Sequence, residues 1–410
     1  MSLTPAIGTW LMGFAGRAGG CTSIRDELYA TALVLDDGCR QLVLISCDLL
    51  AIHPDVVAAT RACVREAPDL AEAQIMVCCT HTHSGPPGYA TPCTRAIDRA
   101  YVAALPHQLT AAVRRAWLAR MPARLGYASG HAAIGINRRK LLKPGYTIIG
   151  ESPAGPVDHS VAVVRIDRSD GSPLATIVNF ACHPIVLGPE NLAVSADFIG
   201  SARTVVEAAT RSPMLYVQGA CGDINPIGGA GATSAACDRL GALLGAEIVR
   251  VYDGIRTRQT AIDLVASTCE IELPLMQSLD PALRPDLPRL AERMDKEFPW
   301  SARMGANGAL MEVQTFEIGD LGIVGVAAEP FAETGLMIKQ RSPFASTLFA
   351  GYTNGCTSYV PTERAYAEGG YEVLAGYIAY RLSYPLASAA EPMIVRACID
   401  ALHLIHQQSH

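Results

Sequence analysis

Two histidines, His81 and His83, stand two residues apart after an apolar run and just before a Gly/Pro turn, in the segment CCTHTHSGPPGY. In an extended segment, residues at these positions point to the same side, which suits one metal ion or one substrate. A pair of hydrogen-bonded histidines at a loop would have the same spacing, and short motifs of this kind are permissive. The pair alone leaves both interpretations open.

Four other segments also place polar residues directly after apolar runs. They are NFACHP (179–184), QGACGDINP (218–226), AAEPF (327–331) and TSYVPT (357–362). Seen alone, His183 is typical of an ordinary strand-end histidine and Tyr359 of a core residue. Glu329 is less ordinary, because a carboxylate beside an apolar run needs a partner. Loops at strand ends are held by a rigid scaffold and often bind ligands, so five of them could form one site.

Other catalytic schemes fit the sequence poorly. The chain has no CxxC and no HExxH, and QGACGDINP lacks the serine of a GxSxG turn. Cys182 adjoins His183, but adjacent residues of a strand point to opposite faces. Asp197 and Asp223 follow the polar segments closely, where they could orient ligand imidazoles or cap the next helix.

The hydrophobic pattern alternates between strands and helices. Apolar runs of strand length cover residues 31–37, 41–50, 73–81, 159–167, 174–183, 213–223, 261–273, 309–319 and 321–329. Apolar residues at three- and four-residue steps predict helices over 53–67, 97–118, 198–211 and 237–255. This alternation indicates an α/β fold with sheets covered by helices and the site at strand-end loops. The Pro- and charge-rich stretch 274–300 is an insertion or connector, and could cover the site as a lid.

Composition limits the partners. The 410 residues are 50% hydrophobic and carry a formal net charge of -6, which argues against nucleic acid or an anionic membrane surface. No signal peptide and no apolar stretch of about 18 residues is evident. The 13 cysteines are scattered without a disulfide framework, which favours reduced thiols and a cytoplasmic protein. The apolar content permits a homo-oligomer without requiring one.

Taken in order, the motifs resemble the catalytic domain of the neutral/alkaline (non-lysosomal) ceramidase family. The resemblance rests on GTWLMGFAGR (8–17), CTHTHSGPPG, GINRR (135–139), NFACHP, SADFIG (195–200), QGACGDINP, AAEPF and TSYVPTERAYAEGGYE (357–372). It implies one ceramidase-like catalytic domain over residues 1–410. It also implies one zinc ion per chain, with ligands at His81, His183, Glu329 and Tyr359.

The resemblance further implies that His83, Arg138 and Tyr371 contact the substrate or the developing oxyanion, with Arg139 an adjacent competitor for the role of Arg138. Either His83 or Tyr371 could protonate the leaving amine. Family members that cleave ceramide carry a serine, proposed as nucleophile, where this chain has Asn225. A carboxamide cannot be that nucleophile, but it can donate a hydrogen bond to an oxyanion.

These features predict hydrolysis of an amide by a zinc-activated water. The sequence shows neither the family's C-terminal immunoglobulin-like domain nor a secretion signal, so we expect a small, soluble substrate. The alternatives are a zinc-dependent esterase, lactonase or deacetylase, a true ceramide amidohydrolase and, more remotely, a binding protein without catalysis. A panel of amides, esters and lactones would distinguish the enzymes, and absence of hydrolysis with zinc present would indicate the binding protein.

Overall fold

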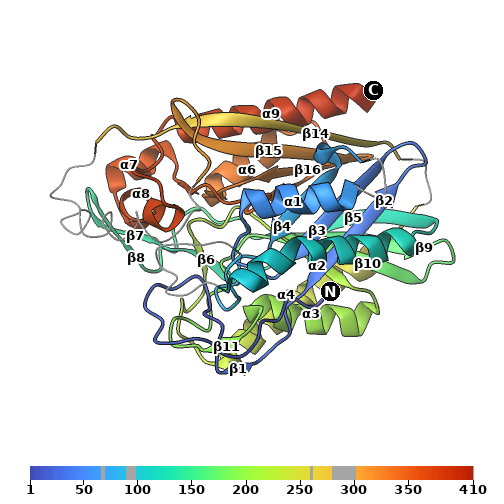
Figure 1. Ribbon diagram of the computed structural model, residues 1–410, viewed down its shortest axis with the longest axis horizontal. Coiled ribbons are helices and arrows are strands. Elements are labelled where there is room, and N and C mark those ends of the chain that lie inside the picture. The colour runs from blue at the N-terminus through green and yellow to red at the C-terminus, as the bar shows by residue number, and fades with distance from the viewer. Residues whose placement is uncertain (66–69, 89–97, 259–261, 279–301, 410) are drawn as a thin grey trace.

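The computed structural model describes residues 1–65, 70–88, 98–258, 262–278 and 302–409. Three sheets of three or four strands surround a central apolar core, and pairs of helices cover their outer faces (Figure 1). The α/β fold with helix-covered sheets is therefore confirmed. Most of the predicted segment 274–300 lies outside the described residues, so its role as lid or connector stays a prediction.

The first sheet has the order β2-β3-β4, with β2 (Ala30–Asp36) antiparallel and β4 (Ile75–Cys79) parallel to β3 (Gln41–Cys47). Helix α1 (Pro54–Arg65) connects β3 with the segment leading to β4 and packs on α2 (Arg99–Leu118). The expected helix at 97–118 begins at Arg99 because the side chain of Asp98 accepts a hydrogen bond from the Tyr101 amide and caps it.

The second sheet has the order β12-β10-β9-β5. Its strands are β5 (Ala123–His131), β9 (Ser160–Arg168), β10 (Pro173–Phe180) and β12 (Met214–Gln218). Only β10 and β12 are parallel, and α3 (Asp197–Thr210) is the crossover between them. Helix α4 (Ser234–Gly254) packs beside α3 and against β5 and β9.

The third sheet has the order β14-β15-β16-β18. Its strands are β14 (Leu264–Pro274), β15 (Gly308–Ile318), β16 (Leu321–Val326) and β18 (Ser346–Ala350). Helix α6 (Ala332–Arg341) lies between β16 and β18 in the chain, and the C-terminal helix α9 (Ala390–Ser409) lies along the outer face. Helices α6 and α9 and strands β5 and β18 were not anticipated from the sequence.

Short elements connect the sheets near one end. The strand pairs are β1 (Ser23–Ile24) with β11 (Ala193–Val194), β6 (Gly135–Asn137) with β13 (Ile224–Pro226), β7 (Arg139–Lys143) with β8 (Tyr146–Ile149), and β17 (Glu329–Pro330) with β19 (Tyr359–Val360). The short helices are η1 (Glu72–Gln74), α7 (Glu363–Glu368), α8 (Tyr371–Leu374) and η3 (Gly376–Tyr380).

Alternation along the strands explains how one core joins three sheets. In β3, Leu42 and Leu44 face the central core, whereas Val43 and Ile45 face the helices. The other sheets alternate likewise, because successive strand residues point to opposite faces. Strands buried on both faces read as continuous apolar runs, which is why the sequence revealed them. None of the described helices is long and apolar enough to cross a membrane.

Candidate metal centre and active site

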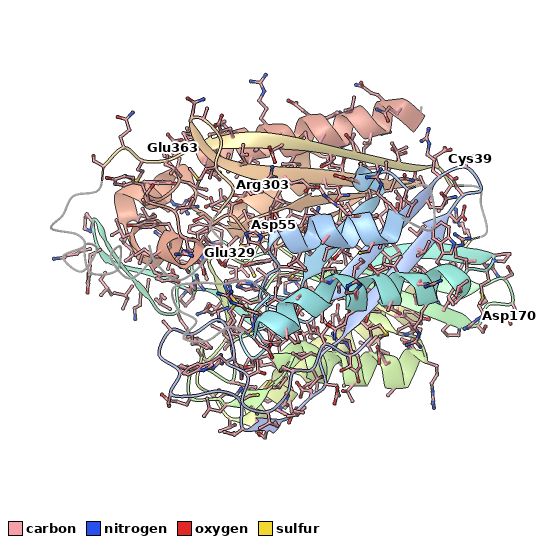
Figure 2. The ribbon with its side chains drawn as sticks, in the orientation of Figure 1. Cys39, Asp55, Asp170, Arg303, Glu329 and Glu363 are labelled. Carbon is pink, nitrogen blue, oxygen red and sulfur yellow. The ribbon has the colours of Figure 1, made fainter. Side chains whose placement is uncertain are left out.

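The predicted strand-end segments meet at one end of the three sheets. The chain leaves β4 toward His81 and His83, β10 toward His183, β12 toward Asn225, and β16 toward Glu329. Figure 2 shows Glu329 inside the molecule, while the labelled turn residues Cys39 and Asp170 mark the opposite end of the sheets. The three histidines lie together, with one nitrogen of each within 4.8 Å of the others.

His81 and His183 are both oriented by backbone carbonyls. The Nδ1 of His81 lies 2.7 Å from the Leu50 oxygen, and the Nδ1 of His183 lies 3.0 Å from the Ile224 oxygen. A carbonyl only accepts, so each Nδ1 carries a proton, and Nε2 is the ring nitrogen that can coordinate a cation. Burial first, and then Arg138, lowers the pKa of His183 to about 4, so this ring is neutral at pH 7.

Both Nε2 atoms face the same carboxylate oxygen. Glu329 Oε2 lies 3.4 Å from His81 Nε2 and 3.3 Å from His183 Nε2, and all three side chains are about 1% exposed or less. Three electron-pair donors thus converge in a buried site.

This donor set fits a divalent metal ion. With both Nδ1 atoms protonated, two lone pairs and a carboxylate face one another, an arrangement that a cation would stabilise. Imidazole nitrogen and carboxylate oxygen are common ligands for zinc, and carbonyls that fix the second ring nitrogen are typical of metal-binding histidines. Asp197 and Asp223 do not orient these rings, contrary to one of the two roles expected for them.

Two tyrosines that the sequence did not identify also contact the Glu329 carboxylate. The hydroxyl of Tyr352 donates to Oε2 over 3.1 Å, and that of Tyr380 donates to Oε1. Tyr352 follows β18 at a strand end, so the rule that located the other residues could have found it. Tyr380 ends the short helix η3, and no local sequence signal indicates its role.

Tyr359 lies beside these groups. Residues Tyr359 and Glu329 are direct partners in the parallel pair of β17 and β19. Burial first, and then the charge of Glu329, raises the pKa of the Tyr359 phenol well above its usual value. Its ring also lies 5.5 Å from the guanidinium carbon of Arg138. Tyr359 thus lies next to both Glu329 and Arg138, at the edge of the group of donors.

His83 differs from the other two histidines. Its Nε2 lies 3.3 Å from His81 Nε2, whereas its buried Nδ1 has no hydrogen-bond partner in the described part of the chain. Burial first, and then the neighbouring His81 and His183, lowers its pKa well below the usual value. His83 is therefore a neutral imidazole beside the centre with no carbonyl to fix it, which suits contact with a substrate better than permanent ligation.

The local backbone differs from the extended segment expected for the histidine pair. Strand β4 ends at Cys79, and His81 has a φ of 67° in the left-handed region. Such a conformation is strained for a non-glycine residue and often marks a functional site. The His81 amide donates to the Leu49 oxygen over 2.9 Å, which helps to hold this turn.

Of the two adjacent arginines, Arg138 is the one that reaches the histidines. Its Nη1 lies 3.4 Å from His183 Nε2 and donates to Asn225 Oδ1 over 3.3 Å. Its Nε donates to Glu372 over 2.8 Å, while Arg139 contacts the other oxygen of Glu372 over 2.6 Å. Arg139 thus supports the carboxylate that positions Arg138, and does not itself line the centre.

Asn225 and Tyr371 complete the set of predicted residues. Because the Oδ1 of Asn225 accepts from Arg138, its Nδ2 is left as a donor. Tyr371 is 38% exposed, with its ring 5.6 Å from that of Tyr359 and 5.9 Å from the Arg138 guanidinium carbon. Tyr371 therefore lies at the mouth of the site, and all eight predicted residues lie in or around it.

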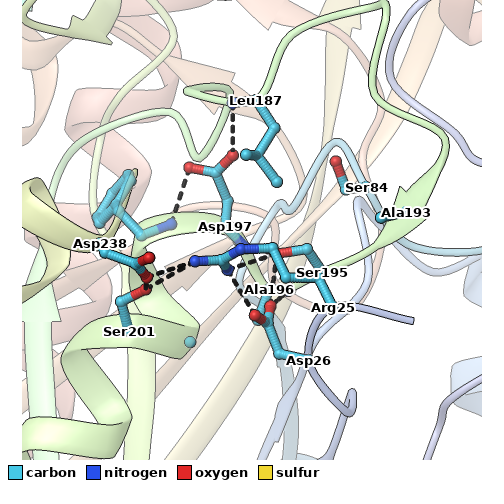
Figure 3. A network of polar contacts seen from close by, with 12 residues as sticks. Arg25, Asp26, Ser84, Leu187, Ala193, Ser195, Ala196, Asp197, Ser201 and Asp238 are labelled. Atoms are coloured by element: carbon cyan, nitrogen blue, oxygen red, sulfur yellow. Dashed lines mark hydrogen bonds and ion pairs between the residues drawn. The ribbon is translucent and has the colours of Figure 1, made fainter. Parts of the chain in front are cut away.

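Asp197 stabilises a loop. It is the first residue of α3, has a φ of 56°, and accepts hydrogen bonds from the amides of Val186, Leu187 and Phe198. Figure 3 shows its carboxylate turned toward Leu187, away from the neighbouring cluster of Arg25, Asp26 and Asp238. It therefore fixes the loop that follows His183, close to the capping role that was the alternative.

Asp223 has a similar role on the other side of the site. It accepts from the Ala332 amide over 2.8 Å and from Asn137 Nδ2 over 2.7 Å. Burial raises its pKa to about 7 despite these bonds. Its contacts connect the segment before Asn225 with the loop after Glu329, so it positions both. It bonds the first amide of α6, a helix far along the chain, and not the next helix α4 that was expected, whose cap is Thr233.

We expect Gly13→Ala to impair turnover through His83. Gly13 has a φ of 108°, and a Cβ built there would lie 2.5 Å from the His83 ring. The methyl group should displace the imidazole. If His83 is the oxyanion donor that the resemblance implies, kcat should fall by about a hundredfold. The matched control is Gly16→Ala, where no atom lies within 4 Å of the added carbon. Equal kcat values for the two variants would refute this role of Gly13.

The fold and the site define a hydrolytic enzyme whose centre could bind a metal ion. The chain belongs to the neutral/alkaline non-lysosomal ceramidase family, because the N-terminal domain model of that family matches residues 3–238. This confirms the resemblance seen in the sequence motifs. Membership makes the protein a hydrolase of the carbon–nitrogen bond of amides. No curated protein sequence matches this chain.

Two solved structures have the same fold. A ceramidase complexed with C2 is 19% identical, with a TM-score of 0.80 over 99% of this chain and 74% of the other. The neutral ceramidase from Pseudomonas aeruginosa is 20% identical, with a TM-score of 0.77 over 99% of this chain and 73% of the other. At this identity the likeness establishes the architecture and leaves the substrate open.

Proposed function

We propose that this protein is a zinc-dependent amidohydrolase acting on a small amide. The observation that carries the proposal is the convergence of two imidazole lone pairs on the buried Glu329 carboxylate, at 3.4 Å and 3.3 Å. His81, His183 and Glu329 would hold the ion, with Tyr359 as the fourth ligand. When bound, zinc supplies Lewis acidity toward a carbonyl oxygen and lowers the pKa of water.

The chain's own residues would stabilise the tetrahedral oxyanion. Asn225 presents its Nδ2 as a hydrogen-bond donor because its oxygen is occupied by Arg138. Neutral His83 offers a ring N–H beside the centre, and Tyr371 offers a hydroxyl at the mouth. Donors fixed before the reaction stabilise the developing charge without reorganisation. Either His83 or Tyr371 would then deliver a proton to the leaving amine.

The residue type at position 225 also limits which group can act as the nucleophile. An amide side chain cannot attack a carbonyl, so water is the nucleophile that this site favours. The buried surroundings would exclude bulk water and strengthen each electrostatic contact with the substrate. Since the same oxyanion donors serve any acyl transfer, an esterase, lactonase or deacetylase shares this chemistry, and ceramide itself stays a candidate substrate.

The proposed function is tested by metal content and a substrate panel. The purified protein should contain about one zinc per chain, and it should release amines from short N-acyl compounds faster than it cleaves matched esters and lactones. Faster cleavage of the oxygen analogues would favour the esterase or lactonase. Full zinc occupancy without hydrolysis of any member, ceramide included, would contradict the proposal and favour a binding protein.

Asn225→Ala should slow turnover without displacing zinc. Removing one oxyanion donor typically costs about 3 kcal/mol in the barrier, which is more than a hundredfold in kcat. Elemental analysis should still give one zinc per chain, because Asn225 contacts no predicted ligand other than through Arg138. If the variant were as fast as the parent, the oxyanion role of Asn225 would be wrong.

A further inference from the structure

Arg17 is a buried arginine in the loop that covers His83. The preceding residues Ala15 and Gly16 are exposed, whereas Arg17 is only 2% exposed. Its Nε donates to the Asn191 oxygen over 3.1 Å, and its Nη1 donates to the Met12 oxygen over 2.9 Å. Its Nη2 is buried and has no hydrogen-bond partner in the described part of the chain.

Arg17 also lacks a carboxylate partner, unlike the other buried arginines. Among the described residues five arginines are buried, and four of them form an ion pair: Arg61 with Glu312, Arg138 and Arg139 with Glu372, and Arg203 with Asp48. No described acidic residue pairs with Arg17. Burial accordingly lowers its pKa to about 10, with no anion to oppose the effect. Burying an unpaired charge costs free energy, which a ligand of opposite charge would offset.

The guanidinium lies close to the proposed active site. The Phe14 ring is 5.2 Å from the Arg17 guanidinium carbon and 4.9 Å from the centre of the His83 ring. The shared ring therefore places the Arg17 charge within about 10 Å of His83. Its partner Met12 directly precedes Gly13, whose backbone adjoins the His83 ring.

A purely structural role would not require this charge. The two carbonyl bonds of Nε and Nη1 tether the loop, and neutral donors could make both of them. The surplus Nη2 and the net positive charge contribute nothing to that tether. Arg138 also lies near the histidines and also has a buried Nη2 without a partner, but it is ion-paired with Glu372, while Arg139 pairs with Glu368 as well. Arg17 is therefore the buried arginine near the site whose positive charge an anionic ligand could neutralise.

We propose that Arg17 binds a carboxylate on the substrate, so that the amide cleaved belongs to an N-acyl amino acid or a similar N-acyl acid. This inference rests on the proposed amidohydrolase function and names the substrate class for the same site. A planar guanidinium pairs well with a carboxylate, and a pair shielded from water is stronger than an exposed one. A separation below about 10 Å corresponds to a few bonds between the scissile amide and the acid.

The test compares N-acetyl ω-amino acids of one to four methylenes with N-acetyl amino alcohols of matched length, in which a neutral hydroxyl group replaces the carboxylate. The parent should prefer the best acid over its alcohol by at least about tenfold in kcat/KM. Arg17→Gln should reduce this ratio to near one, and Arg17→Lys should retain part of it as a point charge. The control Arg250→Gln, an exposed arginine paired with Glu247 on α4, should leave the ratio unchanged.

Calorimetry of the metal-free protein with the same compounds separates this inference from the proposed function. Binding of the acids but not the alcohols, weakened at least tenfold in Arg17→Gln, would support the carboxylate site even if no amide were hydrolysed. Hydrolysis of the acids and alcohols at equal rates, with no selective binding of the acids, would contradict the carboxylate site at Arg17. It would leave the proposed amidohydrolase function supported. Circular dichroism checks that each variant folds, and selectivity unaffected by both Arg17 variants would also overturn it.

Discussion

Glu329→Gln should lose zinc and all measurable hydrolysis. Among the described residues, this carboxylate is the one anionic group that faces the Nε2 atoms of both His81 and His183, and it is about 1% exposed. Glutamine keeps the shape and removes the charge, but its single carbonyl oxygen can accept from only one of Tyr352 and Tyr380, which donate to different oxygens of Glu329. Mutating a residue that merely hydrogen-bonds to a metal ligand typically lowers metal affinity ten- to a hundredfold. Loss of the ligand itself should therefore lower zinc affinity by more than about a hundredfold.

Competition with a coloured zinc chelator measures that affinity. The matched control is Glu333→Gln on α6, a partly exposed carboxylate paired with Arg364 on the surface. The control should bind zinc as the parent does. A Glu329→Gln variant with parental affinity would show that the histidines hold the metal without this carboxylate.

Gln218→Met should cost stability and metal affinity together. The fully buried Gln218 side chain donates to the carbonyls of Thr80 and Cys182 and accepts from the amides of Cys182 and Gly219. It therefore connects the residue before His81 with the residue before His183. Methionine fits the volume but leaves these backbone groups unsatisfied, at about 1–3 kcal/mol each. We expect the free energy of unfolding to fall by at least about 3 kcal/mol, as measured with guanidinium chloride.

A second buried glutamine separates the two effects. Gln314 is also fully buried, and its amide donates to the carbonyls of Ala73 in η1 and of Ile75, the first residue of β4. Gln314→Met should therefore lower stability by a similar amount while zinc affinity stays close to that of the parent. Equal loss of zinc affinity in both variants would mean that Gln218 acts only on global stability.

The sequence predicted those site residues whose position follows from local sequence patterns. His81, His183 and Glu329 each follow a buried strand, and strand ends of neighbouring sheets can meet at one edge, so position along the chain was informative. The nearby polar segment with Arg138 was identified only through the resemblance to a known family. The sheets were evident because strands buried on both faces read as apolar runs. Strand β5 escaped detection because its residues are mostly half-exposed and include two glycines.

Other features depend on contacts that the chain makes only after folding. Tyr380 reaches Glu329 from a short helix 51 residues away in sequence, and nothing in GYIAY distinguishes it from a core tyrosine. The carbonyls that orient His81 and His183 belong to Leu50 and Ile224, residues whose side chains indicate only burial. Arg17 ends the motif GTWLMGFAGR, but only the structure shows that its Nη2 has no partner among the described residues.

The most direct test of the metal centre is X-ray absorption spectroscopy of the zinc-loaded protein at the zinc edge. We predict two imidazole ligands at about 2.0–2.1 Å with the remaining ligands oxygen, and no sulfur near 2.3 Å. The absence of sulfur is informative because Cys221 lies close by, with its Sγ 3.1 Å from the Tyr352 hydroxyl that contacts Glu329. Two imidazoles without sulfur would support the centre formed by His81, His183 and Glu329. A sulfur ligand, or fewer than two imidazoles, would contradict it.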